Sequence, residues 1–292
     1  MERCCAGRGQ KNFGLAFSAV GEGVSQTLVE GLEALMDWLV PQWPAPPQVR
    51  ALCTTRVGGS SRAPFDSLNL GDHVGDSPGA VAANRSLLQQ AMNVRTIFLK
   101  QVHGVQTISL SDRTDQSTVA DGCSTDQPGL ACTVMVADCL PVLITNERGS
   151  VVAAGHAGWR GLAGQGGFGI LESVLSSLDS LPGADALAGR SAILAWLGPC
   201  IGPKAFLVGA DVRDAFVSQD PVAAAMFVAQ AGEKWLADLQ GLARLRLNSL
   251  GVQKIHGNDG TDSWCTVSHP ARYFSHRRDG VSGRMAACIW LT

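Results

Sequence analysis

The sequence lacks several features that would place it at once in a familiar class of protein. Positive charge is not in excess, because 23 lysine and arginine residues face 25 acidic residues and the net charge is −2. This balance argues against a nucleic-acid polymer as a partner, since proteins that bind one carry a strongly basic surface. No stretch approaches the roughly 18 apolar residues of a membrane span, so we predict no membrane partner.

A secretion signal and a disulfide framework are missing as well. Residues 1–5 start the chain without the basic and apolar regions of a signal peptide. The nine cysteines are odd in number, irregularly spaced and free of any C-x-x-C pair. Both observations predict a cytoplasmic protein with reduced thiols.

The sequence also lacks the usual nucleotide-binding loops. No G-x-x-x-x-G-K-[ST] motif occurs, so any phosphate must be held by arginine side chains and loop amides. Residues 164–169 match G-x-G-x-x-G, but the strand before them is predicted to end near Gly155, and no acidic strand end follows where a dinucleotide site needs one. We interpret this segment as a flexible loop.

What the sequence does contain indicates a well-packed globular chain. Hydrophobic residues make up 46% and charged residues 16% of its 292 positions, as is typical of a protein with a large core. Residues 1–27 are rich in small and polar residues, and the prolines within 41–47 form a stiff connector. Between them, helical spacing predicts a short amphipathic helix from Leu28, Leu32, Leu35, Met36 and Leu39. We therefore divide the chain into a partly disordered N-terminal extension, residues 1–44, and a main domain, residues 45–292.

Apolar periodicity predicts the elements of the main domain. Strands are expected at residues 49–56, 96–103, 105–110, 129–137, 140–145, 150–155, 192–197, 272–274 and 286–291. Helices are expected at residues 80–92, 170–178, 210–216 and 223–250, the last interrupted near Gly232 and Gly241. The segment 105–110 is interpreted as the hairpin neighbour of 96–103. Such neighbouring strands favour an α+β domain with mixed β-sheets over a doubly wound parallel sheet.

Three soft metal ligands stand at the ends of predicted strands. His103 ends the strand 96–103, Cys139 follows the apolar run 129–137, and His156 follows the strand 150–155. Zinc accepts two histidines and one cysteine readily, and three protein ligands leave a fourth position open for chemistry. Each residue alone is more often structural than functional. Their shared position at strand ends indicates a metal site.

Seven short motifs occur in order along the chain, at residues 54–59, 100–104, 120–122, 137–142, 155–161, 197–202 and 274–280. Together they resemble the YfiH family, also called the laccase-domain or multicopper polyphenol oxidase family, over about residues 45–292. The resemblance implies a single-domain α/β/β/α sandwich, distantly similar to the catalytic domain of cytotoxic necrotizing factor. It also implies that His103, Cys139 and His156 are ligands of Zn²⁺, with Cu²⁺ as the alternative metal.

The resemblance further implies a zinc-dependent purine nucleoside phosphorylase with adenosine deaminase activity. Its small-molecule partners would be phosphate and adenosine, inosine, guanosine or S-methyl-5′-thioadenosine, and the enzyme would be a monomer or a small homo-oligomer. Arg56 and Arg160 lie in glycine-flanked turns, where a guanidinium can fork onto phosphate, and we assign both to catalysis and substrate binding. Asp138 is assigned a catalytic role, either orienting the site or contacting the ribose. Gln101 is assigned to substrate binding.

Three other functions stay open. The family's older name implies copper-dependent phenol oxidation, although a multicopper site needs many histidines and the chain has only six. A branch associated with peptidoglycan editing suggests a hydrolase in which Cys139 attacks an amide with His103 or His156 as base. The non-enzymatic alternative is a structural zinc site.

Two segments depart from the family pattern. Residues 162–168 add several residues after the motif at 155–161, which could reshape the rim of the pocket. Residues 205–209 carry Ala-Phe-Leu-Val-Gly where the family commonly has a Tyr-Glu pair, so a role for that carboxylate is in doubt. Near the end of the chain, Arg277 and Arg278 are predicted to pair with Asp279 or another acidic neighbour.

Overall fold

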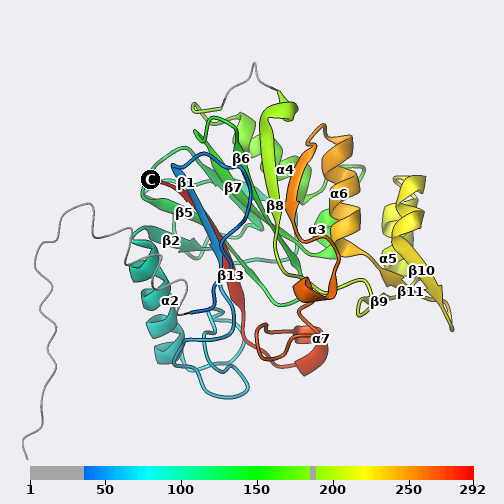
Figure 1. The fold of residues 1–292 in the computed structure, drawn as a ribbon, viewed down its shortest axis with the longest axis horizontal. Helices are drawn as coiled ribbons and strands as arrows, with labels where there is room; N and C mark the ends of the chain where they lie inside the picture. The colour runs from blue at the N-terminus through cyan, green and yellow to red at the C-terminus, as the bar shows by residue number, and fades with distance from the viewer. Residues whose placement is uncertain (1–35, 185–188) are drawn as a thin grey trace, which may run out of the picture.

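The computed structural model describes residues 36–184 and 189–292. Two β-sheets pack face to face, and helices cover the outer face of each sheet (Figure 1). The predicted α/β/β/α sandwich with mixed sheets is therefore confirmed. Among the described residues, no helix combines the length and the apolar character that crossing a membrane requires.

The first sheet has four strands in the order β1-β13-β5-β2. Its strands are β1 (Val49–Cys53), β2 (Arg95–Phe98), β5 (Leu130–Val136) and β13 (Met285–Leu291). β13 runs antiparallel to both of its neighbours, whereas β2 runs parallel to β5. Every residue of β5 is buried, because one face meets the second sheet and the other meets a helix. This position explains why its sequence is almost continuously apolar.

The second sheet has six strands in the order β12-β8-β6-β7-β4-β3. Its strands are β3 (Thr107–Ser109), β4 (Gly122–Thr125), β6 (Leu140–Asn146), β7 (Val152–Ala157), β8 (Ile193–Leu197) and β12 (Lys254–Gly257). Side chains along β6 alternate between two cores. Leu143 points between the sheets, whereas Val142 and Ile144 face the helices.

The helices divide between the two outer faces. α2 (Pro78–Met92) packs through Leu88, Ala91 and Met92 on the four-stranded sheet. α3 (Trp159–Ala163), α4 (Ile170–Asp179) and α6 (Leu239–Ser249) bury apolar side chains in the core on the six-stranded sheet. α2 starts with a proline in its first turn and ends at Asn93 in the left-handed conformation, as helix-terminus preferences predict.

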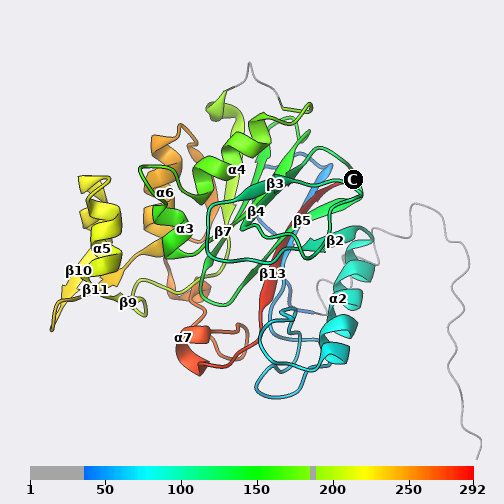
Figure 2. The same ribbon diagram turned by 180° about the vertical axis from the view of Figure 1, so that it is seen from behind.

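A small subdomain lies at the end of the molecule away from α2 in both views (Figures 1 and 2). It contains α5 (Ala210–Val217) and a three-stranded sheet of β9 (Leu207–Val208), β10 (Phe227–Gln230) and β11 (Lys234–Ala237). The remaining short elements are α7 (His276–Asp279) and the 3-10 helices η1 (Arg190–Ala192), η2 (Pro221–Met226) and η3 (Asp262–Trp264).

Three predicted elements are wrong. The expected helix over 223–250 forms only as α6, because Gly232 and Glu233 take positive φ angles of 69° and 53° and turn β10 back along β11 as a hairpin. The segment 105–110 is no hairpin partner of β2, since β3 lies in the other sheet and pairs in parallel with β4. Residues 272–274 form no strand. The strand expected at 96–103 already ends at Phe98, so His103 lies in the loop after β2 and does not end a strand. The other predicted strands and helices appear near their expected bounds.

Part of the predicted N-terminal extension packs on the main domain. Trp38 is 6% exposed and joins the core beneath α2. Leu39 forms an antiparallel bridge with Cys53, with two backbone hydrogen bonds of 2.8 Å. Residues 36–39 are therefore not helical, and the rest of the predicted amphipathic helix lies outside the described residues. The seven cysteines at described positions are all free thiols.

Candidate active site

The three predicted metal ligands lie together. The ligand atoms of His103, Cys139 and His156 are all within 4.8 Å of one another. His103 lies between β2 and β3, and Cys139 lies between β5 and β6, so each stands where the chain crosses from one sheet to the other. His156 belongs to β7 and pairs with Pro141 on the neighbouring β6, which brings it beside Cys139. The two imidazole rings meet edge to face with 4.8 Å between their centroids.

A buried carboxylate holds two of these ligands in place. Asp121 is fully buried, and one of its oxygens accepts a hydrogen bond of 2.8 Å from Nδ1 of His156. The same carboxylate accepts the backbone N–H groups of Val102, His103 and Gly104 at 3.2, 2.9 and 2.8 Å. These bonds stabilise the turn in which His103 has a φ of 60°, a conformation that is costly for a residue with a side chain.

The charge on Asp121 also fixes the tautomer of His156. Burial raises the pKa of this carboxyl. The hydrogen bond and charge of His156, together with the backbone amides, lower the pKa by more than burial raises it, so the net shift is downward. An ionised carboxylate only accepts hydrogen bonds, so Nδ1 of His156 carries the hydrogen. Burial lowers the pKa of His156, but the charges of Cys139 and Asp121 and their hydrogen bonds raise it to about 9, so without a metal the imidazole is positively charged. A metal would replace the hydrogen on Nε2, as in other carboxylate–histidine–metal arrangements.

Cys139 has the electrostatic setting of a thiolate. Burial raises its pKa, but the positive charge of His156 and hydrogen bonds from His103 and His156 outweigh that effect and lower the pKa to about 6. A thiolate is the form that binds metals. Gly158 permits the close packing, because a Cβ there would lie 3.0 Å from Sγ of Cys139 and 3.1 Å from Cδ2 of His103.

The donor set fits a zinc ion with an open coordination position. Two imidazoles and one thiolate are borderline to soft ligands of the kind that zinc binds in sets of four, and three such ligands converge here among the residues that the structure describes. The supporting carboxylate of Asp121 completes the arrangement. The thiolate also suits copper in its reduced form, so the ligands alone do not choose between the two metals.

A cavity of about 410 Å³ opens directly onto the three ligands. This volume is within the range of small-molecule sites. Besides the ligands, its walls are formed by His73, Gln101, Met135, Ala137, Asp138, Trp159, Arg160, Ile201, Phe206, Leu239, His276, Arg277 and Arg284. Three of the four other residues that we assigned from sequence, namely Gln101, Asp138 and Arg160, therefore reach the cavity, and Arg56 does not line it.

Arg56 is engaged elsewhere. Its Nε and Nη1 donate to the carbonyl oxygens of Asp66 and Pro270 at 2.9 and 2.8 Å, and Nη2 forms an ion pair of 3.2 Å with the Asp66 carboxylate. The guanidinium also stacks 4.7 Å from the ring of Phe274. These contacts tie the loop after β1 to the segment before α7, and they leave the phosphate-binding role of Arg56 a prediction without geometric support.

Gln101 and Asp138 line the cavity, and their side chains also hydrogen-bond neighbouring segments of its wall. Both ends of the Gln101 amide bond the backbone of Met135, with Nε2 donating at 2.9 Å and Oε1 accepting at 2.7 Å. Asp138 accepts the hydroxyl of Thr266 and the backbone N–H of Arg277, each at 2.6 Å. Asp138 also has a φ of 93°. These contacts favour positioning over direct chemistry for both residues, whose assigned roles stay predictions.

The sequence interpretation missed that Arg277 and Arg284 line the cavity together with Arg160. Arg277 belongs to α7, Arg284 lies between α7 and β13, and His73 and His276 also line the cavity. The guanidinium of Arg277 lies 5.5 Å from the ring of Phe206 and is not paired with Asp279, contrary to prediction. Arg278 forms that ion pair, as predicted, at 2.7 Å. Only the motif at 274–280 had marked this region in the sequence.

Arg284 is the most informative of these cations. Burial lowers the pKa of its guanidinium, and the negative charges of Cys139 and Asp138 act in the opposite direction. All of its side-chain hydrogen bonds run from Nη1 to Ser282 and Gly283, and in the described part of the chain it forms no ion pair with a carboxylate. A half-buried arginine without a carboxylate partner is an effective site for an anionic ligand.

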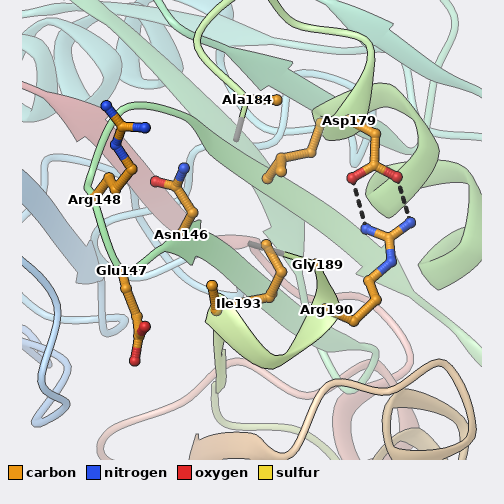
Figure 3. A pocket seen from close by; sticks show the side chains of 10 residues that line it. Asn146, Glu147, Arg148, Asp179, Ala184, Gly189, Arg190 and Ile193 are labelled. Atoms are coloured by element: carbon orange, nitrogen blue, oxygen red, sulfur yellow. Dashed lines mark hydrogen bonds and ion pairs between the residues drawn. The ribbon is translucent and has the colours of Figure 1, made fainter. Parts of the chain in front are cut away.

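Another cavity, of about 300 Å³, lies near the opposite end of β6 (Figure 3). Two of its charged side chains, Arg190 and Asp179, already bind each other through two hydrogen bonds. No histidine or cysteine lines it among the described residues. The chemistry of the chain is therefore concentrated at the larger cavity over the His-Cys-His cluster.

Comparison with known proteins identifies the family to which this chain is similar and the names of its relatives. The family model described as multi-copper polyphenol oxidoreductase laccase matches residues 50–292. A Pseudomonas aeruginosa protein named purine nucleoside phosphorylase is 48% identical over 257 residues, covering 87% of this chain and 98% of its own length. The purine nucleoside phosphorylase YfiH of Escherichia coli strain K12 is 47% identical over 255 residues, covering 87% of this chain and 98% of its own.

Two solved structures share the fold. The crystal structure of a Neisseria meningitidis protein has a TM-score of 0.79 and 44% identity, covering 87% of this chain and 98% of its own. The structure of YlmD from Geobacillus stearothermophilus has a TM-score of 0.78 and 31% identity, covering 87% of this chain and 96% of its own.

Proposed function

This chain belongs to the multi-copper polyphenol oxidoreductase laccase family, and from that membership and the geometry of its site we propose that it is a zinc-dependent purine nucleoside phosphorylase. It would convert adenosine, inosine, guanosine or S-methyl-5′-thioadenosine and phosphate into the free base and a ribose 1-phosphate. The names of its relatives support the reaction class. The observation that carries the proposal is a cavity that holds both a His-Cys-His cluster and two arginines, Arg160 and Arg284, that form no ion pair with a carboxylate in the described part of the chain.

Phosphate would be bound by the arginines of the cavity. Within the described residues, Arg284 is half-buried with no carboxylate partner, and the side chain of Arg160 forms no hydrogen bond or ion pair, its guanidinium lying 4.3 Å from the Trp159 ring. Arg277 approaches the same space. These side chains can neutralise phosphate and hold it against the ribose, which converts a bimolecular reaction into a positioned one.

The ligand cluster adds the second requirement of phosphorolysis. When bound by His103, Cys139 and His156, zinc would supply a Lewis acid with one open coordination position. Asp121 would keep His156 in the correct tautomer throughout. Leu239, Ile201 and Phe206 line the cavity with apolar surface and limit water around the reacting groups.

Adenosine deamination is the second activity that we propose for this site. It consumes one water and releases ammonia, so it needs a metal with an open position and a nearby group able to hold a proton. His276 and His73 line the cavity and provide such groups. Release of ammonia from adenosine without phosphate, recorded beside phosphorolysis, tests this activity independently.

Two alternative chemistries use the same residues. The family description favours copper-dependent phenol oxidation, but the cluster contains only two of the six histidines of the chain. The low pKa of Cys139 favours a thiol hydrolase, for which alkylation of Cys139 would remain fast in zinc-loaded protein. Protection of the thiol by zinc would count against that hydrolase.

A metal-exchange assay tests the main proposal. Purified protein incubated with inosine and phosphate is expected to release hypoxanthine and ribose 1-phosphate, measured by liquid chromatography, and to release neither without phosphate. Treatment with a chelator should abolish the activity, and added zinc should restore it. Restoration by copper alone, together with phenol oxidation, would instead support the oxidase. Zinc-loaded protein that forms no ribose 1-phosphate from any of the four nucleosides would refute the proposal.

Arg284→Met is expected to raise the KM for phosphate about 10–100-fold while changing the KM for inosine little. A charge-assisted hydrogen bond to phosphate contributes about 1.5–3 kcal/mol, and each 1.4 kcal/mol corresponds to a factor of about ten. The phosphate KM of Arg284→Lys should lie between those of the original protein and Arg284→Met, because lysine keeps the positive charge but cannot donate two parallel hydrogen bonds. Steady-state kinetics with phosphate varied would measure the effect. Arg213→Met is the matched control, since Arg213 stacks on Trp235 and lines no cavity over the ligands. An unchanged phosphate KM in both Arg284 variants would contradict the assignment.

A further inference from the structure

A hollow of about 580 Å³ adjoins the cavity just described. The two share His103, Trp159 and Arg160, so they meet beside the metal ligands with the Trp159–Arg160 pair between them. Its lining includes Phe168 and Gln165 from residues 162–168, the segment that we interpreted as an addition to the family pattern. We refer to this hollow as the Phe168 groove.

The wall carrying Phe168 is an ordered turn. Gln165 and Phe168 exchange two backbone hydrogen bonds of 3.1 and 3.0 Å, and Gly166 and Gly167 between them have φ angles of 58° and 83°. This is the pattern of a tight two-residue turn, which requires positive φ at both central positions. The backbone N–H of Gly167 donates to Oε1 of Gln219 at 3.1 Å and anchors the tip. The segment that we interpreted as a flexible loop therefore presents a fixed surface.

Close backbone packing sets the position of that turn. Gly164 has a φ of 65°, and a Cβ on it would lie 2.1 Å from the carbonyl oxygen of Phe168. At the other side of the groove, a Cβ on Gly161 would lie 2.6 Å from the carbonyl oxygen of Gly104, which follows His103. Both glycines are therefore needed for Phe168 to stand this close to the metal ligands.

The two hollows differ in chemistry. The cavity over the ligands gathers Arg160, Arg277 and Arg284, which suit an anion. The Phe168 groove offers the ring of Phe168, which is 49% exposed, together with Trp159, Gln165 and Arg160. An exposed aromatic ring on an ordered turn, with an amide side chain in the same lining, suits a flat heteroaromatic ring with polar edges.

We propose that the Phe168 groove binds the purine base of the nucleoside, while phosphate occupies the cationic cavity. This inference rests on the proposed phosphorylase function and specifies which part of the substrate lies where. It places the ribose at the junction formed by His103, Trp159 and Arg160. Residues 162–168 then become a determinant of base binding.

The arrangement matches the geometry of the reaction. A phosphate oxygen forms a bond to C1′ while the bond from C1′ to N9 of the base breaks, and the electron pair of that bond stays on the base. The proton of the hydrogen phosphate ion ends on the departing base, so charge and atoms balance. Nucleophile and leaving group must lie on opposite sides of C1′. Two hollows that meet at one pair of side chains provide those two sides.

Equilibrium binding of the separate products and substrates tests the assignment. Calorimetric titration of the zinc-loaded protein with free hypoxanthine is expected to show a Kd about 10-fold higher for Phe168→Ala than for the unsubstituted protein, because one stacked base is lost. Titration with inorganic phosphate should give an unchanged Kd in that variant. Arg284→Met should show the reverse pattern. Phe168→Trp should bind hypoxanthine at least as tightly as the original protein.

A matched control and a folding check accompany these titrations. Val222→Ala removes a similarly exposed apolar side chain, 62% exposed, that lines neither hollow, and it should change neither Kd. Thermal melting should show that Phe168→Ala folds normally, since its side chain is half exposed.

The outcomes separate this inference from the proposed function. If the original protein releases ribose 1-phosphate but Phe168→Ala binds hypoxanthine unchanged, the base lies elsewhere and only the inference fails. An equal loss of hypoxanthine and phosphate binding in Phe168→Ala would also overturn it, because the groove would not then be specific to the base. If the original protein neither binds hypoxanthine nor cleaves inosine, the phosphorylase function itself fails.

Discussion

Cys139→Ser is expected to lower the rate of phosphorolysis by about 1000-fold or more while the protein remains folded. A catalytic metal contributes several kcal/mol of transition-state stabilisation, and each 1.36 kcal/mol corresponds to about tenfold in rate. A serine hydroxyl stays protonated near neutral pH and cannot replace a thiolate whose pKa is about 6. Metal analysis should show that the variant loses bound zinc in parallel with activity.

The same variant tests whether the metal is structural. The sheets bury their own apolar cores on both faces, and Cys139 is only half-buried, so its replacement should lower the melting temperature by only a few degrees. Cys265→Ser is the matched control, because Cys265 accepts a backbone N–H from Gly202 at 3.3 Å, which a serine oxygen can also accept. Global unfolding of Cys139→Ser, with Cys265→Ser intact, would show that the metal holds the fold and would contradict a catalytic site.

Asp121→Asn is expected to weaken zinc binding about 10–100-fold, as loss of a supporting partner does in other metal sites. The amide keeps one accepting oxygen but turns the other into a donor, which faces N–H groups that also donate. His156 loses the charge that holds its hydrogen on Nδ1. Competition with a chromogenic chelator would measure the affinity, and nitrogen NMR of the imidazoles would report the tautomer.

Two comparisons make the Asp121 result specific. Asp220→Asn is the control, since Asp220 also accepts a backbone N–H, from Val222 at 2.9 Å, but lines no cavity over the ligands. Asp121→Ala should lower the free energy of unfolding by about 3 kcal/mol, because it leaves several buried donors without an acceptor. Unchanged zinc affinity and an unchanged tautomer in Asp121→Asn would show that the carboxylate serves only the turn at His103.

The strands that hold the ligands could be predicted from sequence because both of their faces are buried. β5 and β6 are continuous apolar runs, and polarity returns at Asp138 and Cys139 where the chain leaves the core. The same signal marked His156, which was expected just after a strand and lies within the last residues of β7. Periodicity alone predicted only a domain with mixed β-sheets. The α/β/β/α sandwich followed from the motifs, because they indicated the family.

Other parts of the site depend on contacts that no local pattern records. Arg56 and Arg284 both lie near glycines in the sequence. Arg56 forms an ion pair with Asp66, whereas Arg284 forms none with any carboxylate among the described residues and lines the cavity. Asp121 lies in a marked motif, yet its role depends on His156, which is 35 positions away. The hairpin of β10 and β11 was mistaken for helix because Gly232 was interpreted as an interruption, not as the turn itself.

The placement of the ligands at two sheet crossings links metal binding to the stability of the whole sandwich. His103 and Cys139 stand where the chain leaves the four-stranded sheet for the six-stranded one, and His156 belongs to the second sheet. A metal held by all three acts as a clamp between the sheets, so any force that slides one sheet over the other must also stretch the coordination bonds. By mass action, a metal that binds only the native protein would then stabilise the sandwich by an amount that grows with the logarithm of the metal concentration. A substitution between the sheets that lowers the melting temperature of the metal-free protein should therefore be partly offset by added metal.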